Sequence, residues 1–271
     1  MDSKTKNRKT REQIAAMAAR AFNGVPLAND DTAVRELKDG WFNAAFEVRL
    51  ADGREVVLKI APPPGAEVMQ YEKNIMASEV AAMRLARQNP AIPVPEIYFH
   101  DQAKDLCDAE YFFMEKVDAD TLKHVKSTLP PETLSEVEQQ IGEIIREVNT
   151  FAGTYFGYEG NPELRAPTWR EAFLKIFESV LKDAERKKVE FDFGYDEFRG
   201  VILKHLAALN EVTTPCLIHW DAWSANFFVK EGQVVGLIDF ERSLWAEPLM
   251  EAQFRPLFGE GITRPLAKVV G

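Results

Sequence analysis

Apolar and polar residues alternate with different periods along this chain, and each period predicts an element. Apolar residues recur at helical spacing over residues 11–22, where Thr10 and Gln13 have the spacing of a capping box, so a helix is expected. Over residues 46–50 the period falls to two, a Gly-containing turn follows, and residues 55–60 form a second apolar strand pattern. An antiparallel hairpin is therefore expected there.

The rest of the chain has mostly helical periodicity, interrupted by short apolar runs. Helices are expected over about residues 67–88, 131–151, 168–188 and 196–211, and strands over 93–99 and 109–117. A β-rich first part followed by a helical part predicts an α+β fold with two lobes, residues 1–115 and 116–271. The first lobe would hold a small antiparallel sheet with a helix, and the second would be mainly helical with a short hairpin. The cleft between such lobes is where chemistry is expected.

Polar residues with catalytic potential gather in one stretch, LIHWDAWSANFFVKEGQVVGLIDFE, which occupies residues 217–241. Its apolar runs predict three short strands, over residues 216–218, 227–229 and 234–238. The polar side chains therefore fall at strand ends and in the loop between strands: His219, Asp221, Asn226 and Asp239. Loops held by a rigid scaffold are where catalytic groups concentrate.

Composition and charge narrow the class of protein. With 271 residues, 46% of them apolar, the chain can bury a large core. A net charge of −10 and a pI near 5.1 disfavour nucleic-acid binding. Cys107 and Cys216 lie far apart and fit two reduced thiols in a cytoplasmic protein. The basic first 12 residues lack a following apolar run, so neither a secretory signal nor a membrane anchor is expected. The pattern leaves open a monomer or a homodimer.

Three charged residues upstream of this stretch have two interpretations each. Lys59 lies within the predicted strand over residues 55–60, where the local pattern favours an exposed strand lysine. Glu72 and Glu79 are seven residues apart, which places them on roughly the same side of one predicted helix. Either could face a cleft, although a solvated helix glutamate is the simpler interpretation.

The order of these residues carries more information than any one of them. His219-x-Asp221 precedes Asn226 by five residues, Asp239 follows after a hairpin, and a strand lysine and a helix glutamate come earlier. This order resembles the aminoglycoside phosphotransferase family of the protein-kinase-like fold, whose pattern is His-Gly-Asp-x-x-x-x-Asn followed by Ile-Asp. VVLKIAPP and YEKNIMASEVAAMRL look like the lysine strand and the following helix of that family. The resemblance covers about residues 37–253.

The resemblance implies a role for each residue of the stretch. Asp221 would orient the substrate hydroxyl, with acceptance of its proton as a further role. Asn226 and Asp239 would hold Mg²⁺, a hard cation that prefers oxygen ligands, against the nucleotide phosphates. His219 would order the loop through hydrogen bonds.

The resemblance also implies how the first lobe would bind ATP or GTP. Lys59 would contact the α- and β-phosphates and pair with a glutamate, which we expect to be Glu79, with Glu72 as the alternative. Backbone amides of the turn over residues 38–45 would cap the phosphates. Two residues of that turn, Gly40 and Asn43, are the candidates there. The nucleotide base would meet the backbone near residues 114–116, with Glu115 and Val117 as the candidate positions.

Departures from the family pattern concern the acceptor. Trp220 replaces the usual glycine, so its indole either shapes the acceptor site or packs in the core. An activation loop of the protein-kinase type is not evident after Asp239, which favours a small-molecule acceptor over a protein. Glu247, Glu251 and Glu260 could meet an amine-bearing acceptor, although exposed glutamates give the same pattern. Only 32 residues follow Asp239, so a short or truncated acceptor lobe is expected.

The leading hypothesis is an ATP- or GTP-dependent kinase that phosphorylates a hydroxyl of a small molecule. The alternative is a catalytically silent nucleotide-binding protein of the same fold that acts through partners. A hydrolase using Asp221 and Asp239 with two metals is a third possibility, but it leaves Lys59 without a role.

Overall fold

The computed structural model of this chain describes residues 5–38, 40, 42–192 and 194–253. These residues form two compact units. The first contains the chain up to Glu67 together with Val94–Asp118, and the second contains Val68–Pro93 together with the chain from Ala119 on. The segment over residues 68–93 packs with the second unit, and the lobes over residues 1–115 and 116–271 stay a prediction.

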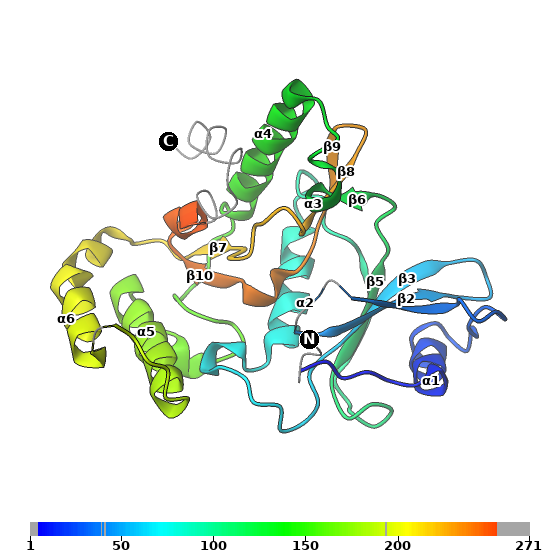
Figure 1. Cartoon of the computed structure of the whole chain (residues 1–271), viewed down its shortest axis with the longest axis horizontal. Helices are drawn as coiled ribbons and strands as arrows, with labels where there is room; N and C mark the ends of the chain where they lie inside the picture. Colours follow the sequence, from blue (N-terminus) through cyan, green and yellow to red (C-terminus); the bar gives the residue numbers. More distant parts are fainter. Residues whose placement is uncertain (1–4, 39, 41, 193, 254–271) are drawn as a thin grey trace. The chain divides into compact units, whose positions relative to one another are not determined.

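The first unit is an antiparallel sheet with one helix (Figure 1). Its elements are α1 (Arg11–Ala21), β1 (Val34–Leu37), β2 (Ala44–Arg49), β3 (Glu55–Ile60), β4 (Ile97–Asp101) and β5 (Tyr111–Glu115). The strand order is β1-β2-β3-β5-β4, and every neighbouring pair is antiparallel. Ile14, Met17 and Phe22 of the α1 segment join the apolar side chains of β2, β3 and β5 in one buried cluster. The predicted helix and hairpin are confirmed.

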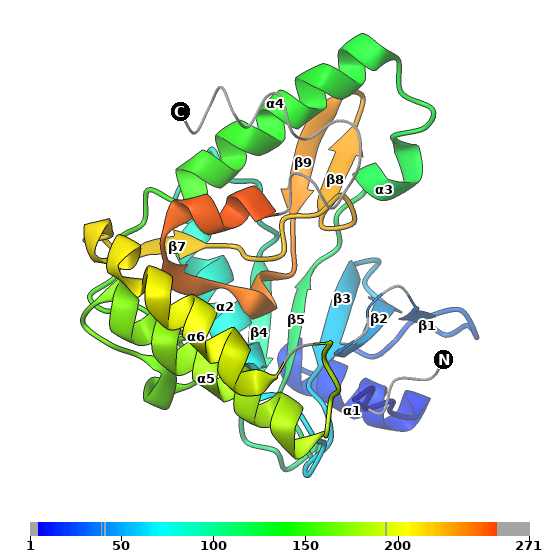
Figure 2. The same ribbon diagram turned by 60° about the vertical axis from the view of Figure 1, so that its left-hand side comes forward.

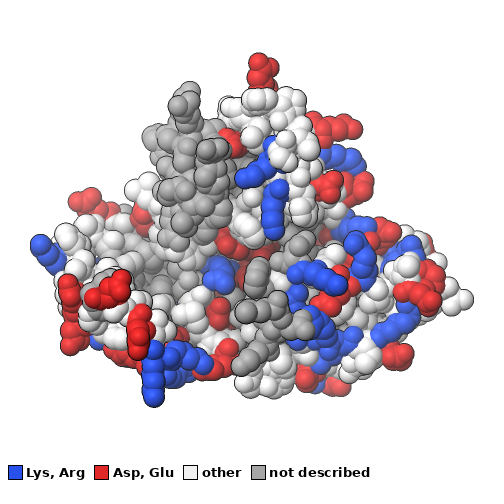
Figure 3. Space-filling view, in the orientation of Figure 1, with Lys and Arg blue, Asp and Glu red and all other residues white. Residues whose placement is uncertain are grey.

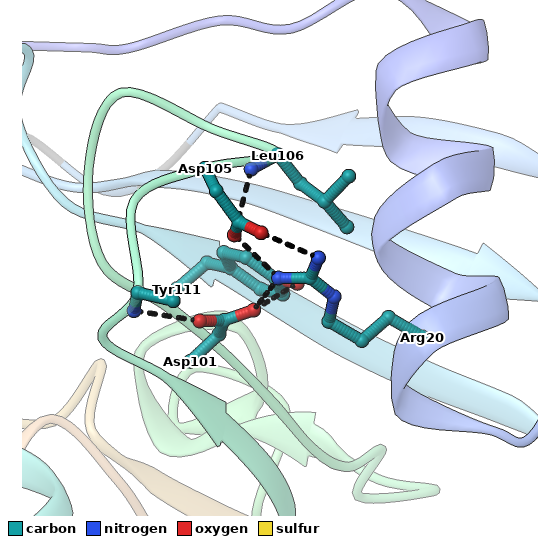
Figure 4. A network of polar contacts seen from close by, with 6 residues as sticks. Arg20, Asp101, Asp105, Leu106 and Tyr111 are labelled. Atoms are coloured by element: carbon teal, nitrogen blue, oxygen red, sulfur yellow. Dashed lines mark hydrogen bonds and ion pairs between the residues drawn. The ribbon is translucent and has the colours of Figure 1, made fainter.

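Hydrogen bonds at its two ends explain where α1 begins and how it is attached to the sheet. Thr10 accepts from the backbone N–H of Gln13, and the Gln13 side chain accepts from the backbone N–H of Thr10, so the capping box is present. At the other end of the helix, the Arg20 guanidinium lies 2.8 Å from Asp101 and 2.5 Å from Asp105, and the Tyr111 hydroxyl donates to Asp101 (Figure 4). Arg20 lowers the pKa of Asp105 to about 2. This network joins α1 to β4 and β5.

The second unit is mainly helical. Its helices are α2 (Ile75–Ala86), α3 (Leu122–Val125), α4 (Pro131–Val148), α5 (Trp169–Arg186) and α6 (Tyr195–His205). Short 3₁₀ turns connect them: η1 (Gln70–Glu72), η2 (Pro162–Leu164), η3 (Leu206–Glu211), η4 (Phe240–Arg242) and η5 (Pro248–Gln253). The strands are β6 (Asp120–Thr121), β7 (Cys216–Ile218), β8 (Phe227–Lys230), β9 (Gln233–Leu237) and β10 (Leu244–Ala246). They form two small sheets, β6-β8-β9 and β10-β7. In Figure 2, α5 and α6 lie side by side and α4 runs along β8 and β9.

One predicted helix is shorter than expected. The helix predicted over residues 67–88 begins only at Ile75, because Asn74 has a left-handed backbone (φ 51°, ψ 32°) and Lys73 is extended. Glu72 therefore lies in η1, where its carboxylate accepts from the backbone N–H of Met69, and not on the same helix as Glu79. The predicted common face for these two glutamates is wrong.

Surface charge and helix hydropathy bear on possible partners. On the face drawn in Figure 3, Lys and Arg side chains are interspersed with Asp and Glu and form no continuous basic area. Over the residues that the structure describes, no helix has the length and apolar character needed to cross a membrane. The absence of a nucleic-acid partner stays a prediction.

Candidate active site

The loop that follows β7 is fixed by the side chain of His219. This residue is fully buried, and its Nδ1 accepts from the backbone N–H of Asp221 at 3.2 Å. Its Nε2 lies 2.9 Å from the carbonyl oxygen of Ile238. Both contacts are satisfied together only by the neutral tautomer that carries its proton on Nε2. The ring therefore connects the start of the loop to the end of β9, which is a structural function.

Trp220 has a backbone conformation that favours glycine. Its φ is 60°, in the left-handed region, where a bulky side chain is rarely found. Its indole is half-buried and packs against the apolar cluster that contains Phe156, Ile218 and Leu244. Both interpretations of Trp220 therefore retain support, since the ring packs on the core and is also partly exposed.

Asp221 and Asn226 contact each other across the loop. The Asn226 side-chain amide donates to the backbone oxygen of Asp221 at 2.9 Å and to its Oδ2 at 3.1 Å. Asn226 is 4% exposed, while Asp221 is half-buried. Because Nδ2 is used in these contacts, Oδ1 is the Asn226 atom suited to a cation. The loop thus holds a half-buried carboxylate beside a buried side-chain amide.

A second set of acidic groups forms where η4 packs on α2. Glu79, Asp239 and Glu241 each place a carboxylate oxygen within 4.8 Å of the others. Glu79 is fully buried and Glu241 is 7% exposed, so simple solvation does not account for their charge. The donor atoms are all oxygens, which suits Mg²⁺ better than a thiolate- or imidazole-preferring metal. The prediction of a solvated Glu79 is wrong.

The backbone conformation at Asp239 sets the direction of its side chain. It precedes η4 with φ 70° and ψ 52°, a left-handed conformation that Asp tolerates better than most residues. The residue follows directly from the hydrogen-bonded end of β9, where the Ile238 N–H donates to the Asn226 carbonyl. The β8-β9 hairpin therefore keeps Asn226 and the segment of Asp239 together.

Lys59 is the charged nucleotide-binding candidate of the first unit. Lys59 lies on β3 and is only 8% exposed, with its Nζ 5.9 Å from the ring centroid of Phe112. The prediction of an exposed strand lysine is wrong, since the residue is buried on β3, the middle one of the neighbouring strands β2, β3 and β5. Buried lysines are rare unless paired. Its pairing with Glu79 or Glu72 would join the two units and stays a prediction.

The other candidates of the first unit lie at the ends of strands. Asn43 is 4% exposed and directly precedes β2, and Gly40 lies three residues before it. The rest of this turn includes positions 39 and 41, which lie outside the described residues. Glu115 ends β5, where its N–H donates to the Glu96 carbonyl, and Val117 follows it in an irregular segment. Their contacts with a nucleotide stay predictions.

The two glutamates proposed to meet the acceptor differ in their surroundings. Glu247 is half-buried and its carboxylate accepts from the backbone N–H of Leu249. Glu251 is 6% exposed, and its Oε1 accepts from the backbone N–H groups of His219 at 2.5 Å and Trp220 at 3.3 Å. The Glu251 carboxylate is therefore engaged with the loop backbone, and its contact with an acceptor stays a prediction. Glu260 lies outside the described residues. Burial raises the pKa of Glu251 to about 7.

Arg242 is a site residue that the sequence pattern did not identify. Its guanidinium donates to the Tyr71 hydroxyl at 2.9 Å and lies 3.8 Å from Glu72. Burial opposes its charge, but Tyr71, Glu241 and Asp221 raise the pKa of Arg242. It therefore adds a fixed positive charge to the environment of Asp221. Its position directly after Phe240-Glu241 was the only available signal in the sequence.

A cavity of about 640 Å³ lies elsewhere in the second unit. It is lined by residues of η1, η2 and α5, among them Gln70, Asn161, Lys175 and Asp183. None of the predicted site residues lines it, so it is separate from the catalytic loop.

Known proteins share sequence or fold with this chain. A subtelomeric hrmA-associated cluster protein of Aspergillus fumigatus is 32% identical over 125 residues, which are 46% of this chain and 24% of that protein. The match thus spans about a quarter of the length of that relative. Among solved structures, the streptomycin–ATP complex of APH(2")-IIa has a TM-score of 0.68 at 14% identity, covering 97% of this chain and 82% of that one. A putative fructosamine-3-kinase from Thermobifida fusca has a TM-score of 0.64 at 20% identity, covering 95% and 84%.

The structural matches establish the protein-kinase-like fold, in which an antiparallel sheet with a helix precedes a helical part with short sheets. The model of the phosphotransferase enzyme family matches residues 33–252, which include all of β1 to β10 and the whole catalytic loop. This chain therefore belongs to the phosphotransferase enzyme family.

Proposed function

We propose that this protein transfers the γ-phosphoryl group of a Mg-bound nucleoside triphosphate to a hydroxyl of a small molecule. The observation that carries the proposal is the assembly of the catalytic loop with the β8-β9 hairpin. Asp221 is held by the amide of Asn226, while Asp239 lies with Glu79 and Glu241 in an oxygen-rich cluster. Phosphoryl transfer needs positioned charges rather than a covalent nucleophile from the protein, and this site supplies them.

Asp221 is the proposed catalytic residue. Its carboxylate orients the acceptor hydroxyl and takes its proton as the acceptor oxygen bonds to the γ-phosphorus and the bond to the β-phosphate oxygen breaks. Asn226 donates to Oδ2 of Asp221, which fixes the rotation of the carboxylate. The neutral His219 ring fixes the backbone on the other side of the residue.

The metal would be held by Asn226 Oδ1 and Asp239, with the remaining carboxylates of the cluster nearby. When bound, Mg²⁺ neutralises charge on the phosphate oxygens. In the first unit, Lys59 would contact the α- and β-phosphates, Gly40 and Asn43 would lie along them, and the backbone at Glu115 and Val117 would meet the base.

The acceptor class is proposed as amine-bearing alcohols, with ATP and GTP both as candidate donors. Two observations support this class. The solved relatives include an aminoglycoside kinase bound to streptomycin and ATP and a putative fructosamine kinase. In addition, Glu247 directly follows β10, the strand that pairs with β7 at the start of the catalytic stretch. A cytoplasmic location and the oligomeric state remain predictions from sequence.

The proposal is tested by a phosphoryl-transfer screen of amine-bearing alcohols with each nucleotide and Mg²⁺. Turnover that Asp221→Asn abolishes, with an unchanged thermal unfolding curve, is the expected result. Asp196→Asn is the matched control, because the Asp196 side chain is fully exposed on α6. Turnover that survives Asp221→Asn would remove Asp221 from the mechanism. A thermal shift by Mg-nucleotide without turnover on any acceptor would instead favour the silent nucleotide-binding protein.

A further inference from the structure

The cavity of about 640 Å³ in the second unit lies where α5 runs beside the segment that leads into α2 (Figure 1). Its volume is within the range of small-molecule sites, which is roughly 300–1,000 Å³. Two leucines, the buried Leu164 of η2 and the half-buried Leu174 of α5, supply apolar lining, and polar and charged side chains supply the rest. The cavity thus has the size and the mixed lining of a site for a small organic molecule.

The buried part of the lining is a set of hydrogen bonds to Gln70, the first residue of η1. Asp183 is 6% exposed and accepts from the Gln70 N–H at 2.8 Å, while the buried Asn161 donates to the Gln70 carbonyl at 2.8 Å. Both main-chain groups of Gln70 are therefore bound. Its side-chain amide has no partner among the residues that the structure describes, so this amide is available to a ligand.

The acidic side chains that line the cavity are already engaged. Three of the four are ion-paired: Glu178 with Arg199 at 3.2 Å, Glu163 with Lys73 at 3.8 Å, and Asp183 with Arg186 at 2.8 Å. The fourth, Glu171, accepts from the Thr168 hydroxyl at 3.0 Å. Ion pairing lowers the attraction of a carboxylate for a further cation, so the lining favours an amine-bearing ligand little.

The basic side chains at the end of α5 keep donors for a ligand. Lys182 has no ion pair or hydrogen bond from its ammonium group among the described residues. Arg186 uses Nη2 for Asp183, which fixes the guanidinium and leaves Nη1 and Nε. Residues 182 and 186 are four positions apart and so lie on the same face of the helix. Two positive charges and the Gln70 amide therefore surround a single carboxylate, that of Asp183.

We propose that this cavity binds a small organic anion. Its phosphate or carboxylate group lies between Lys182, Arg186 and Gln70, and its apolar part contacts Leu164 and Leu174. Arg186 is prepared for this contact because Asp183 already holds one edge of the guanidinium, so little side-chain entropy is lost on binding. None of the residues with a role in the proposed phosphotransfer lines the cavity, so the binding does not depend on the proposed function.

Occupation of the site stabilises η1. Gln70 lines the cavity, and the next two residues, Tyr71 and Glu72, contact Arg242 of the catalytic segment. A ligand that binds only the closed arrangement makes local opening less frequent by a factor of 1 + [L]/Kd. The Glu72 N–H, which donates to the Met69 carbonyl, reports on this opening. The ligand and Arg242 thus act on the same three-residue turn.

Binding is tested with phenyl phosphate on protein that carries ¹³C-labelled leucine methyl groups. The Leu174 methyl signals are assigned from their loss in Leu174→Met, and they should shift to saturation with a Kd of about 1 mM or lower. Lys182→Gln should weaken binding about tenfold or more, because it removes a charge-assisted hydrogen bond. Lys204→Gln is the matched control and should leave the Kd unchanged, since Lys204 is an exposed lysine of α6 outside the cavity.

The class of ligand is tested with three analogues. Benzoate presents a carboxylate in place of the phosphate, and benzyl alcohol and benzylamine present a neutral and a cationic group. At least one of the two anions should bind about tenfold more tightly than benzyl alcohol, and benzylamine no more tightly than benzyl alcohol. Equal affinities of anions and benzyl alcohol, or tighter binding of benzylamine, would overturn the anionic class. Shifts confined to leucines other than Leu164 and Leu174 would place the anion elsewhere and overturn the site.

The effect on η1 is measured by hydrogen exchange. At a phenyl phosphate concentration ten times the Kd, exchange of the Glu72 N–H should slow about tenfold, and in Lys182→Gln at the same concentration less than about threefold. An exchange rate that the ligand leaves unchanged in the unmodified protein would overturn the link to η1. None of these measurements uses phosphotransfer, so a failure of the proposed function leaves the result intact.

Discussion

Replacement of Glu251 by glutamine should make the protein more stable at high pH relative to the unmodified chain. Burial raises the pKa of Glu251 from 4.5 to about 7. A carboxyl group whose folded-state pKa lies above its unfolded-state pKa contributes stability that is fully present below about 4.5. That contribution is lost as pH rises through about 7. The ionised carboxylate of Glu251 accepts hydrogen bonds from the catalytic loop, but the folded protein is less stable with this form than with the protonated form.

The size of the effect follows from the two pKa values. At 1.36 kcal/mol per pH unit, the difference between 4.5 and about 7 corresponds to about 3 kcal/mol in the free energy of unfolding. Glutamine does not ionise. The free energy of unfolding of Glu251→Gln should therefore rise by about 3 kcal/mol relative to that of the unmodified chain. The change should occur between about pH 4.5 and about pH 7 and then stop.

The assay is urea unfolding of both proteins at a series of pH values, followed by circular dichroism. The difference between the two unfolding free energies, and not either value alone, is the quantity to compare, since every other titrating group cancels. Glu138→Gln should give a change of the same sign, because burial also raises the pKa of Glu138. A difference between Glu251→Gln and the unmodified chain that is constant over this range would refute the reasoning.

Four further predictions concern the site and the first unit. Asp221→Asn should lower kcat at least about 100-fold with little change in the Mg-nucleotide thermal shift, measured by single-turnover phosphotransfer and by thermal unfolding. Asn226→Ala removes the donor to Asp221 and an amide oxygen, so it should weaken both turnover and the dependence on Mg²⁺, measured by titration of the metal. Removal of Mg²⁺ with a chelator should abolish the nucleotide-induced thermal shift, and a shift that persists in chelator would contradict the cation site. Arg20→Met leaves Asp101 buried without its cation and should destabilise the first unit by about 2 kcal/mol, measured by hydrogen exchange of α1 and β4 amides.

Arg242 illustrates a site residue that could not have been chosen from sequence. An arginine after Phe240-Glu241 has many possible partners, and nothing local selects among them. Its contacts with Tyr71 and Glu72 come from a segment about 170 residues earlier, and they form only when η4 packs on α2 and η1. Asn74 is a second example. Its left-handed backbone makes α2 begin at Ile75, later in the chain than the apolar spacing predicted.

The sequence by itself determined the local elements and the order of the catalytic groups. The α1 capping box, the β2-β3 hairpin and the β8-β9 hairpin depend on residues within a few positions of one another, so their spacing alone predicts them. The same is true of Asp221 and Asn226, which meet across a five-residue loop. Only the tertiary structure decided which charged side chains are buried. Lys59, Glu79 and Glu251 all have the local pattern of exposed residues, yet each is less than 9% exposed. Their burial is set by packing between segments distant in sequence, where the cost of desolvating a charge is offset by partners that no local pattern reveals.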